Sequence, residues 1–154
     1  MVIQIDTREK AHAIQGILKT FEKAGVQYFS SKCFVGDYVS LDKPRLSVDR
    51  KRSLLELCMD IGKDHDRFIA ELKRAKQYGI RLIVLCEHGR DITCLEDVRN
   101  WKNPVGKISG QTLYKTLRTL SERYDVGFMF CSKSETGRMI IDILNDVAGR
   151  EGAN

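Results

Sequence analysis

The sequence has no long apolar segment, and this absence excludes a membrane-spanning helix. No hydrophobic run among its 154 residues approaches the roughly 20 residues that such a helix needs. The N-terminus begins with Val2-Ile3-Gln4-Ile5, which is typical of a strand and lacks the charged leader and cleavage site of a secretory signal. We therefore expect a soluble intracellular protein with no membrane partner.

The sequence also lacks a CxxC pair and a glycine-rich phosphate-binding loop. Its five cysteines are an odd set scattered among apolar neighbours, so the sequence indicates neither a disulfide framework nor a zinc knuckle. We expect reduced, mostly buried thiols, and Cys86 and Cys131 are predicted to pack inside core strands. The absence of a P-loop argues against a nucleotide-utilising enzyme.

The composition favours one domain with a basic surface. A hydrophobic content of 42% over this length is enough for a single core, and we predict one domain over residues 1–150 with a loose tail at 151–154. The net charge is +5, and residues 1–77 carry 15 Lys and Arg against 11 Asp and Glu. A basic surface suits a polyanionic partner such as nucleic acid, although many other soluble proteins carry a similar charge.

Hydrophobic periodicity predicts strands that alternate with helices. A continuous apolar run at residues 82–85 predicts a strand buried on both faces, at the centre of the sheet. We therefore predict a three-layer α/β domain with a central mixed sheet flanked by helices. The predicted strands are residues 2–6, 26–33, 38–41, 46–51, 81–86 and 126–131, and the predicted helices are 13–25, 54–61, 68–79, 95–101, 112–124 and 136–148.

The strongest functional pattern is Gly36-Asp37 followed at strand distance by Asp49-Arg50-Lys51. If residues 39–41 and 46–51 form a hairpin, Asp37 and Asp49 meet at one end and can bind one hard cation through oxygen. Lys51 projects from the same strand face as Asp49 and can act on a phosphate as a general base or as a charge stabiliser. These residues predict metal-assisted phosphodiester hydrolysis.

Each of these residues has a structural alternative. A Gly-Asp pair is common in turns, and Lys51 could simply form a salt bridge with Asp37 or Asp49. Asp49 is harder to explain structurally, because a partly buried carboxylate needs a cation or hydrogen bonds to stay ionised. Arg50 points to the opposite face, where it could bind a phosphate of DNA or hold the motif in place.

A second charged group, Asp6, Arg8 and Glu9, follows the first predicted strand. The ends of neighbouring strands share one sheet edge, so Asp6 and Glu9 could join the metal site and Arg8 could contact a phosphate. The alternative is a helix start, in which Asp6 caps the helix and Glu9 lies in its first turn.

Later charged residues are weaker candidates. Glu56, Arg67 and Glu71 could face the same cleft, although Arg67 and Glu71 could equally form a surface pair on one helix. His65 could shuttle protons, but a solvated loop histidine is the simpler interpretation.

A lysine-bearing loop follows the fourth predicted helix. Its residues Lys102 and Lys107 are candidate DNA contacts beside Trp101, which could stack on a single strand or pack as a hydrophobic lid.

These motifs resemble the nuclease domain of the XPF family of structure-selective endonucleases, a branch of the restriction-endonuclease-like PD-(D/E)xK fold. The family pattern is Gly-Asp, a variable gap, Glu-Arg-Lys, three residues and Asp. Gly36-Asp37 and residues 49–51 fit it with Asp for Glu, and residues 6–9 match the family's acidic residue followed by Arg-Glu. Two features differ: Leu55 stands at the last aspartate, with Glu56 as a possible replacement, and the chain ends without a tandem helix-hairpin-helix domain.

The resemblance implies a Mg²⁺- or Mn²⁺-dependent DNA endonuclease that leaves a 5′-phosphate and a 3′-hydroxyl at branched, flapped or junction DNA. It also implies a compact, stand-alone form like those encoded by phages and prophages, in the cytoplasm of a bacterial cell, with a role in DNA repair or recombination. Two alternatives stay open: a non-catalytic DNA-binding or scaffold subunit, and an RNA-processing nuclease. Family nuclease domains often pair through late helices, so residues 136–148 are the predicted interface of a homodimer.

Overall fold

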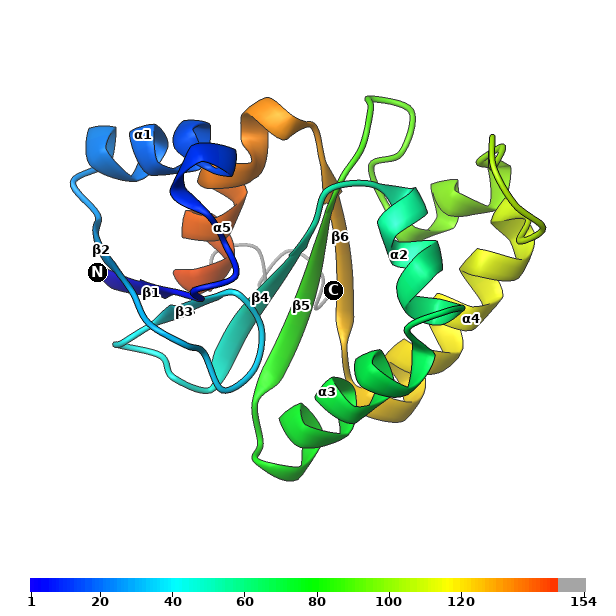
Figure 1. Ribbon diagram of the computed structural model, residues 1–154, viewed down its shortest axis with the longest axis horizontal. Helices are drawn as coiled ribbons and strands as arrows, with labels where there is room; N and C mark the ends of the chain where they lie inside the picture. The colour runs from blue at the N-terminus through cyan, green and yellow to red at the C-terminus, as the bar shows by residue number, and fades with distance from the viewer. Residues whose placement is uncertain (147–154) are drawn as a thin grey trace.

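The computed structural model describes residues 1–146, which form a six-stranded mixed sheet with helices on both faces (Figure 1). The strands are β1 (Val2–Ile5), β2 (Gln27–Ser30), β3 (Tyr38–Ser40), β4 (Leu46–Lys51), β5 (Arg81–Glu87) and β6 (Gly127–Cys131). The α-helices are α1 (Gln15–Lys23), α2 (Leu54–Ile61), α3 (His65–Gln77), α4 (Gly110–Tyr124) and α5 (Thr136–Leu144). Three short 3-10 helices are η1 (Ala11–Ala13), η2 (Leu95–Asn100) and η3 (Lys133–Glu135). The predicted three-layer α/β architecture is confirmed.

The sheet order is β2-β1-β3-β4-β5-β6. Parallel pairs join β1 to β2, β4 to β5 and β5 to β6, whereas β3 runs antiparallel to both β1 and β4. The prediction that residues 81–86 lie at the sheet centre is wrong in position. That strand, β5, is interior but only one place from the edge, because the N-terminal strands β1 and β2 extend the sheet on the other side of β3 and β4.

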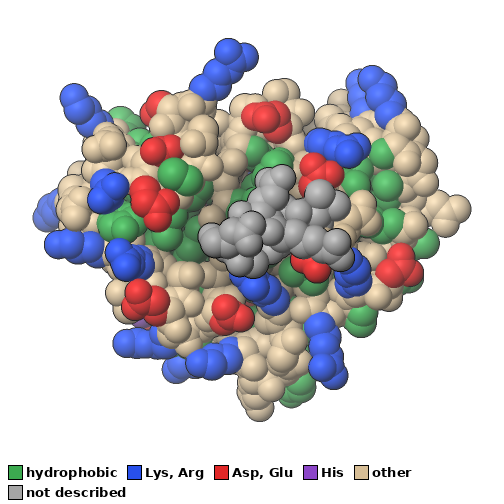
Figure 2. All heavy atoms as spheres, turned by 180° about the vertical axis from the view of Figure 1, so that it is seen from behind, with side chains coloured by type: hydrophobic (Ala, Val, Ile, Leu, Met, Phe, Trp, Pro, Cys, Tyr) green, Lys and Arg blue, Asp and Glu red, His purple; other side chains and the backbone are tan. Residues whose placement is uncertain are grey.

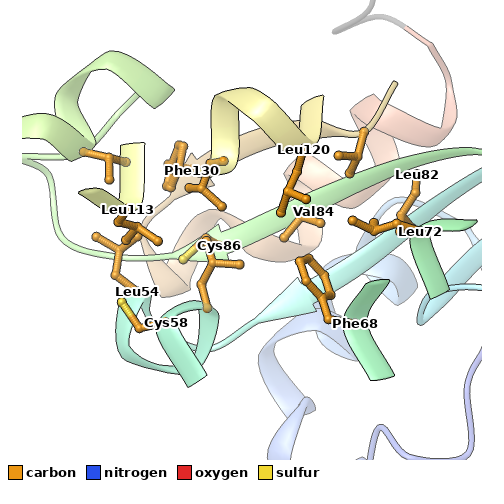
Figure 3. Packing of buried hydrophobic residues seen from close by; sticks show 14 of the residues in the cluster. Leu54, Cys58, Phe68, Leu72, Leu82, Val84, Cys86, Leu113, Leu120 and Phe130 are labelled. Carbon is orange, nitrogen blue, oxygen red and sulfur yellow. The ribbon is translucent and has the colours of Figure 1, made fainter. Parts of the chain in front are cut away.

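Two hydrophobic clusters fill the space on either side of the sheet. In Figure 1, α1 and α5 lie above β1, β2 and β3 and to the left of β4, whereas α2, α3 and α4 lie to the right of β5. Alternate residues of β5 serve the two sides: Leu82 and Val84 pack under α2, α3 and α4 (Figure 3), while Ile83 and Leu85 pack under α1 and α5. The apolar run at residues 82–85 is therefore buried on both faces, as its pattern predicts.

Helix α5 is shorter than predicted and contributes its apolar face to the core. It ends at Leu144, and Asp146 has a positive φ of 63°. Ile140, Ile141 and Leu144 are buried with residues of α1, so this face does not support the predicted dimer interface. Part of that interface and the predicted tail at 151–154 lie outside the described residues.

The prediction of reduced, mostly buried cysteines agrees with the structure. Cys33, Cys58, Cys86 and Cys131 are buried free thiols, and Cys94 is exposed.

Within residues 1–146, no helix is both long enough and apolar enough to cross a membrane. Figure 2 shows Lys and Arg side chains around the outline of the rear face with acidic side chains between them. The positive charge is therefore spread over the described part of that face.

Candidate active site

The candidate site lies at the sheet edge where β1 and β4 end and β3 begins. These ends meet because β1 and β4 both run antiparallel to β3. The backbone N–H of Asp37 donates to the Val48 carbonyl at 2.8 Å, and the N–H of Asp6 donates to the Asp37 carbonyl at 2.8 Å. The predicted hairpin therefore brings Asp37 beside Asp49.

Gly36 makes the tight approach of the loop before β3 possible. Its φ is +73°, a conformation that side chains rarely adopt. A Cβ at this position would lie 2.1 Å from Oγ of Ser47, which donates a buried hydrogen bond to the Val35 carbonyl at 2.7 Å. The Gly-Asp pair is thus both a turn and a means of placing Asp37.

Asp37 and Asp49 line one cavity of about 430 Å³ between η1, β4, α2 and α3. One oxygen of Asp37, Oδ2, accepts a hydrogen bond from the Arg50 N–H at 2.9 Å. Burial and the neighbouring Asp49 charge raise the pKa of Asp37 well above its ordinary value. Two buried carboxyl groups therefore face each other with their negative charges only partly balanced.

Lys51 lies between two carboxylates. Its Nζ is 3.0 Å from Oδ2 of Asp49 and 2.6 Å from Oδ2 of Asp60, a residue of α2. Both carboxylate oxygens lack a partner in hydrogen-bonding geometry, so these contacts are ion pairs rather than aligned hydrogen bonds. Burial alone would lower the pKa of Lys51, but Asp49 and Asp60 outweigh it and raise the pKa above its ordinary value. The lysine is therefore an ammonium.

The donor set of this cavity suits a hard divalent cation. Asp37 and Asp49 offer carboxylate oxygens, the ligands that Mg²⁺ prefers. Burial and the closeness of the Asp49 carboxyl group raise the pKa of Asp37, and Oδ2 of Asp49 accepts no hydrogen bond. A bound cation would relieve both features. Among residues 1–146, His, Cys, Asp and Glu side chains form no cluster of three that could hold an ion unaided. Such a site would resemble those in which Mg²⁺ uses one or two carboxylates and keeps its remaining positions for water or substrate phosphate.

Glu71 of α3 is a further acidic residue that sequence reasoning left unresolved. Its Oε1 accepts a hydrogen bond from the Gly36 N–H at 3.1 Å, and its side chain lines the same cavity. Burial and the Asp49 charge raise the pKa of Glu71. The suggested surface pair does not form, because the ion-pair partner of Arg67 is Asp64, at 3.8 Å. The sequence signal for Glu71 was only its position one helical turn after Arg67.

Asp6 does not join the proposed metal ligands. Its Oδ1 accepts the Cys33 N–H at 2.8 Å, and its Oδ2 accepts both the backbone N–H of Arg8 at 3.0 Å and the Arg8 Nε–H at 2.6 Å. Burial opposes the shift, but these hydrogen bonds lower the pKa of Asp6. Both oxygens are occupied, so Asp6 orders the chain between β1 and β3 instead.

Glu9 and Arg50 form a buried ion pair on the opposite face of β4. Nε and Nη2 of Arg50 donate to the two Glu9 oxygens at 2.6 and 2.7 Å, and Nη1 donates to Oε1 of Glu87 at 3.1 Å. Thr136 of α5 donates to the same Glu87 oxygen. The Arg50 side chain is only 5% exposed. Glu9 and Arg50 also line the cavity. The Glu9 oxygens already bind Arg50, and the Arg50 guanidinium binds both Glu9 and Glu87, so these ion pairs favour the alternative in which Arg50 holds the motif in place. Glu9 as a metal ligand and Arg50 as a DNA contact stay predictions.

Two arginines lie on the rim of the cavity. Arg8 is 64% exposed, pairs with Asp6 and reaches within 3.7 Å of Asp37 Oδ1. Arg67 is exposed on α3, and both residues line the cavity. Their positions fit the prediction that they contact phosphates. Lys102 and Lys107 are exposed on the loop between η2 and α4 and are not among the described residues that line the cavity.

The remaining candidates occupy structural or peripheral positions. Glu56 lines the cavity, but its Oε2 accepts the Arg52 N–H at 2.9 Å at the start of α2. His65 is exposed, with Nδ1 3.2 Å from the Ile61 carbonyl. Trp101 packs against the hydrophobic core, as expected for a hydrophobic lid. His12 of η1 lines the cavity. Sequence reasoning missed it because nothing around it has a recognisable motif.

Comparisons with known proteins place this geometry in a family. The model of the ERCC4 domain matches residues 5–143. Two solved structures share the fold: XPF from Aeropyrum pernix, with a TM-score of 0.68 and 19% identity, and the same protein in complex with DNA, with a TM-score of 0.68 and 18% identity. Each alignment covers 97% of this chain and 66% of the other, so the chain spans just under two thirds of their length. No curated protein sequence matches this chain. The predicted resemblance is confirmed: the chain belongs to the ERCC4 domain family and has the fold of the XPF nuclease domain.

Proposed function

We propose that this protein is a divalent-metal-dependent endonuclease that cleaves DNA at branched, flapped or junction structures. The observation that carries the proposal is the convergence of Asp37, Asp49 and Lys51 in one cavity at the sheet edge. Membership of the ERCC4 domain family and the likeness to XPF in complex with DNA support the choice of DNA.

Asp37 and Asp49 would hold the metal ion. A bound Mg²⁺ or Mn²⁺ supplies Lewis-acid chemistry, polarising a phosphoryl oxygen and lowering the pKa of water. The Asp37 carboxylate accepts a hydrogen bond from the Arg50 N–H, and the Asp49 carboxylate is paired with Lys51, so both are positioned before the substrate arrives.

Lys51 would stabilise the negative charge that develops on the phosphate during cleavage. Its two carboxylate partners keep it protonated, which favours this role over that of a general base. Arg8 and Arg67 on the rim would bind neighbouring phosphates, because an exposed guanidinium forms bidentate hydrogen bonds with phosphate oxygens.

Cleavage of labelled DNA by the purified protein tests this function. Flap, four-way junction and linear duplex substrates are incubated with Mg²⁺, Mn²⁺ or EDTA, beside an RNA of matched sequence. We expect metal-dependent cuts in branched DNA, lost in Asp49→Asn and Lys51→Met, while thermal melting shows that both variants are folded.

Three outcomes would contradict parts of the proposal. Absence of cleavage on every substrate by folded protein, with either metal, would favour a non-catalytic DNA-binding subunit. Faster cleavage of RNA would favour an RNA-processing nuclease. Equal cleavage of linear and branched DNA would reject the preference for branches.

A further inference from the structure

Beside the active-site cavity lies a second hollow with exposed aromatic and basic side chains on its border. Its volume is about 650 Å³, and Arg8 and Glu71 line both this hollow and the active-site cavity. The lining of this second hollow also includes Lys32, Phe34 and Arg74. The two hollows therefore adjoin at Arg8 and Glu71.

Two exposed aromatic residues, Phe34 and Tyr78, lie together at this hollow. Phe34 is 54% exposed and Tyr78 57% exposed, and their rings meet edge to face with centroids 4.9 Å apart. The Arg74 guanidinium lies 5.7 Å from the centre of the Phe34 ring. With Lys32, these residues form what we call the aromatic surface. Single exposed apolar residues are ordinary, whereas a paired aromatic group with two cations is typical of binding surfaces for single-stranded nucleic acid.

The loop that carries Phe34 is held at several points. The Gln4 side chain donates to the Lys32 carbonyl at 3.0 Å, and the Cys33 N–H donates to Asp6. Arg74 Nη1 donates to the Phe34 carbonyl at 3.1 Å, and the next loop residues are fixed by the bond from the Gly36 N–H to Glu71. Phe34 is thus displayed to solvent by an ordered loop, so a ligand that stacks on it need not order the backbone first.

Helix α3 connects the aromatic surface to the active site. Arg67, Glu71, Arg74 and the C-cap residue Tyr78 follow one another at spacings of three or four residues, so they lie along one stripe of the helix. From Arg67 to Tyr78 this stripe extends about 16 Å at 1.5 Å per residue. The stripe therefore begins at the active-site cavity and ends at the aromatic surface.

We propose that the aromatic surface of Lys32, Phe34, Arg74 and Tyr78 binds an unpaired nucleotide of the DNA substrate, next to the bond that is cleaved. The inference rests on the proposed function and adds to it the site that recognises the branch. The base stacks on the Phe34 ring, which lies almost perpendicular to the Tyr78 ring, and the flanking phosphates contact Arg74 and Lys32. A base inside a duplex cannot expose its face to Phe34, so this contact favours DNA with a single-stranded arm.

Equilibrium binding in EDTA tests the proposal without cleavage. The fluorescence anisotropy of a duplex with a single-stranded arm is compared with that of a blunt duplex, for the unaltered protein, Phe34→Ala and Phe34→Leu. We expect Phe34→Ala to weaken binding of the armed duplex about tenfold and to leave blunt-duplex affinity unchanged, since each stacked base contributes substantially to binding. Phe34→Leu keeps apolar bulk on the loop and should also lose affinity, which guards against a folding defect in the alanine variant.

A matched control and a direct readout complete the test. Leu41 is 52% exposed beside the start of β1, at the opposite sheet edge, so Leu41→Ala should bind both DNAs normally. A 2-aminopurine in the arm should be quenched by the unaltered protein and not by Phe34→Ala. Equal affinity of the unaltered protein and both Phe34 variants for the armed duplex would overturn the aromatic surface alone. Failure of the folded, unaltered protein to bind any DNA would overturn the proposed function as well.

Discussion

Asp60 Oδ2 lies 2.6 Å from Nζ of Lys51, closer than Oδ2 of Asp49 at 3.0 Å. Asp60 is one helical turn after Glu56 on α2, the helix that immediately follows the β4 motif. The carboxylate that supports Lys51 is therefore a residue that no motif marked, whereas Glu56 binds the backbone at the start of its own helix.

Asp60→Asn should lower the rate of DNA cleavage about tenfold with little change in KM. The amide keeps the shape of the side chain but removes one of the two charges that hold the Lys51 ammonium in position. Glu56→Gln is the matched control, because it neutralises a carboxylate that lines the same cavity without touching Lys51. Kinetics on a flap substrate measure both, and a larger loss in Glu56→Gln would show that Glu56 is the replacement acid.

Asp37→Asn should abolish cleavage while raising the melting temperature of the metal-free protein. The raised pKa of Asp37 means that its protonated form is favoured by folding. Its contribution to stability is complete below the ordinary Asp pKa and is lost as the pH rises through the raised value. The variant should therefore gain most at neutral pH, and a gain of about 1 kcal/mol would raise the melting temperature by about 2–4 °C.

Melting curves from pH 4 to 8 in EDTA, and again with Mn²⁺, test this prediction. Mn²⁺ should stabilise the unaltered protein and not Asp37→Asn, and this stabilisation should weaken as Asp37 is protonated at low pH. A lower melting temperature of the variant at pH 8 in EDTA would contradict the proposed charge repulsion.

Gly36→Ala should destabilise the fold by more than the cost of its backbone conformation. A left-handed φ costs a non-glycine residue about 1–3 kcal/mol, and here the new Cβ would also displace the buried Ser47 hydroxyl. Gly25→Ala is the matched control: its φ is +70° and no atom lies within 4 Å of the position that a Cβ would take, so it carries only the conformational cost. Urea unfolding monitored by circular dichroism gives both values, and equal losses would show that the Ser47 contact is unimportant.

Arg50→Met should cost about 3–5 kcal/mol of folding free energy, since it leaves the buried charges of Glu9 and Glu87 without their partner. Adding Glu9→Gln and Glu87→Gln should restore part of this loss. The control Arg118→Met removes an exposed pair with Glu122 and should cost under about 1 kcal/mol. Chemical unfolding of the four proteins measures the effect, and a loss as small as that of the control would imply that Arg50 has no structural role.

The layers of the fold and the main candidate site residues could be predicted from the sequence. Period-two and period-3.6 patterns depend only on neighbouring residues, so they predicted the strands, the helices and the burial of residues 82–85. The motif at Asp37, Asp49 and Lys51 was predictable for the same reason, because a hairpin places residues of adjoining strands together.

Which other charged groups meet could not be predicted from the sequence, because it depends on how distant segments pack. Asp6 and Glu9 are at the expected edge, yet their oxygens bind Arg8, Cys33 and Arg50. Asp60 and Glu71 reach the site because α2 packs against β4 and α3 packs against the neighbouring strand β5. Phe34 meets Tyr78 across 44 positions of the chain. Such contacts depend on how whole helices and strands pack together, and a local pattern of residues does not predict that packing.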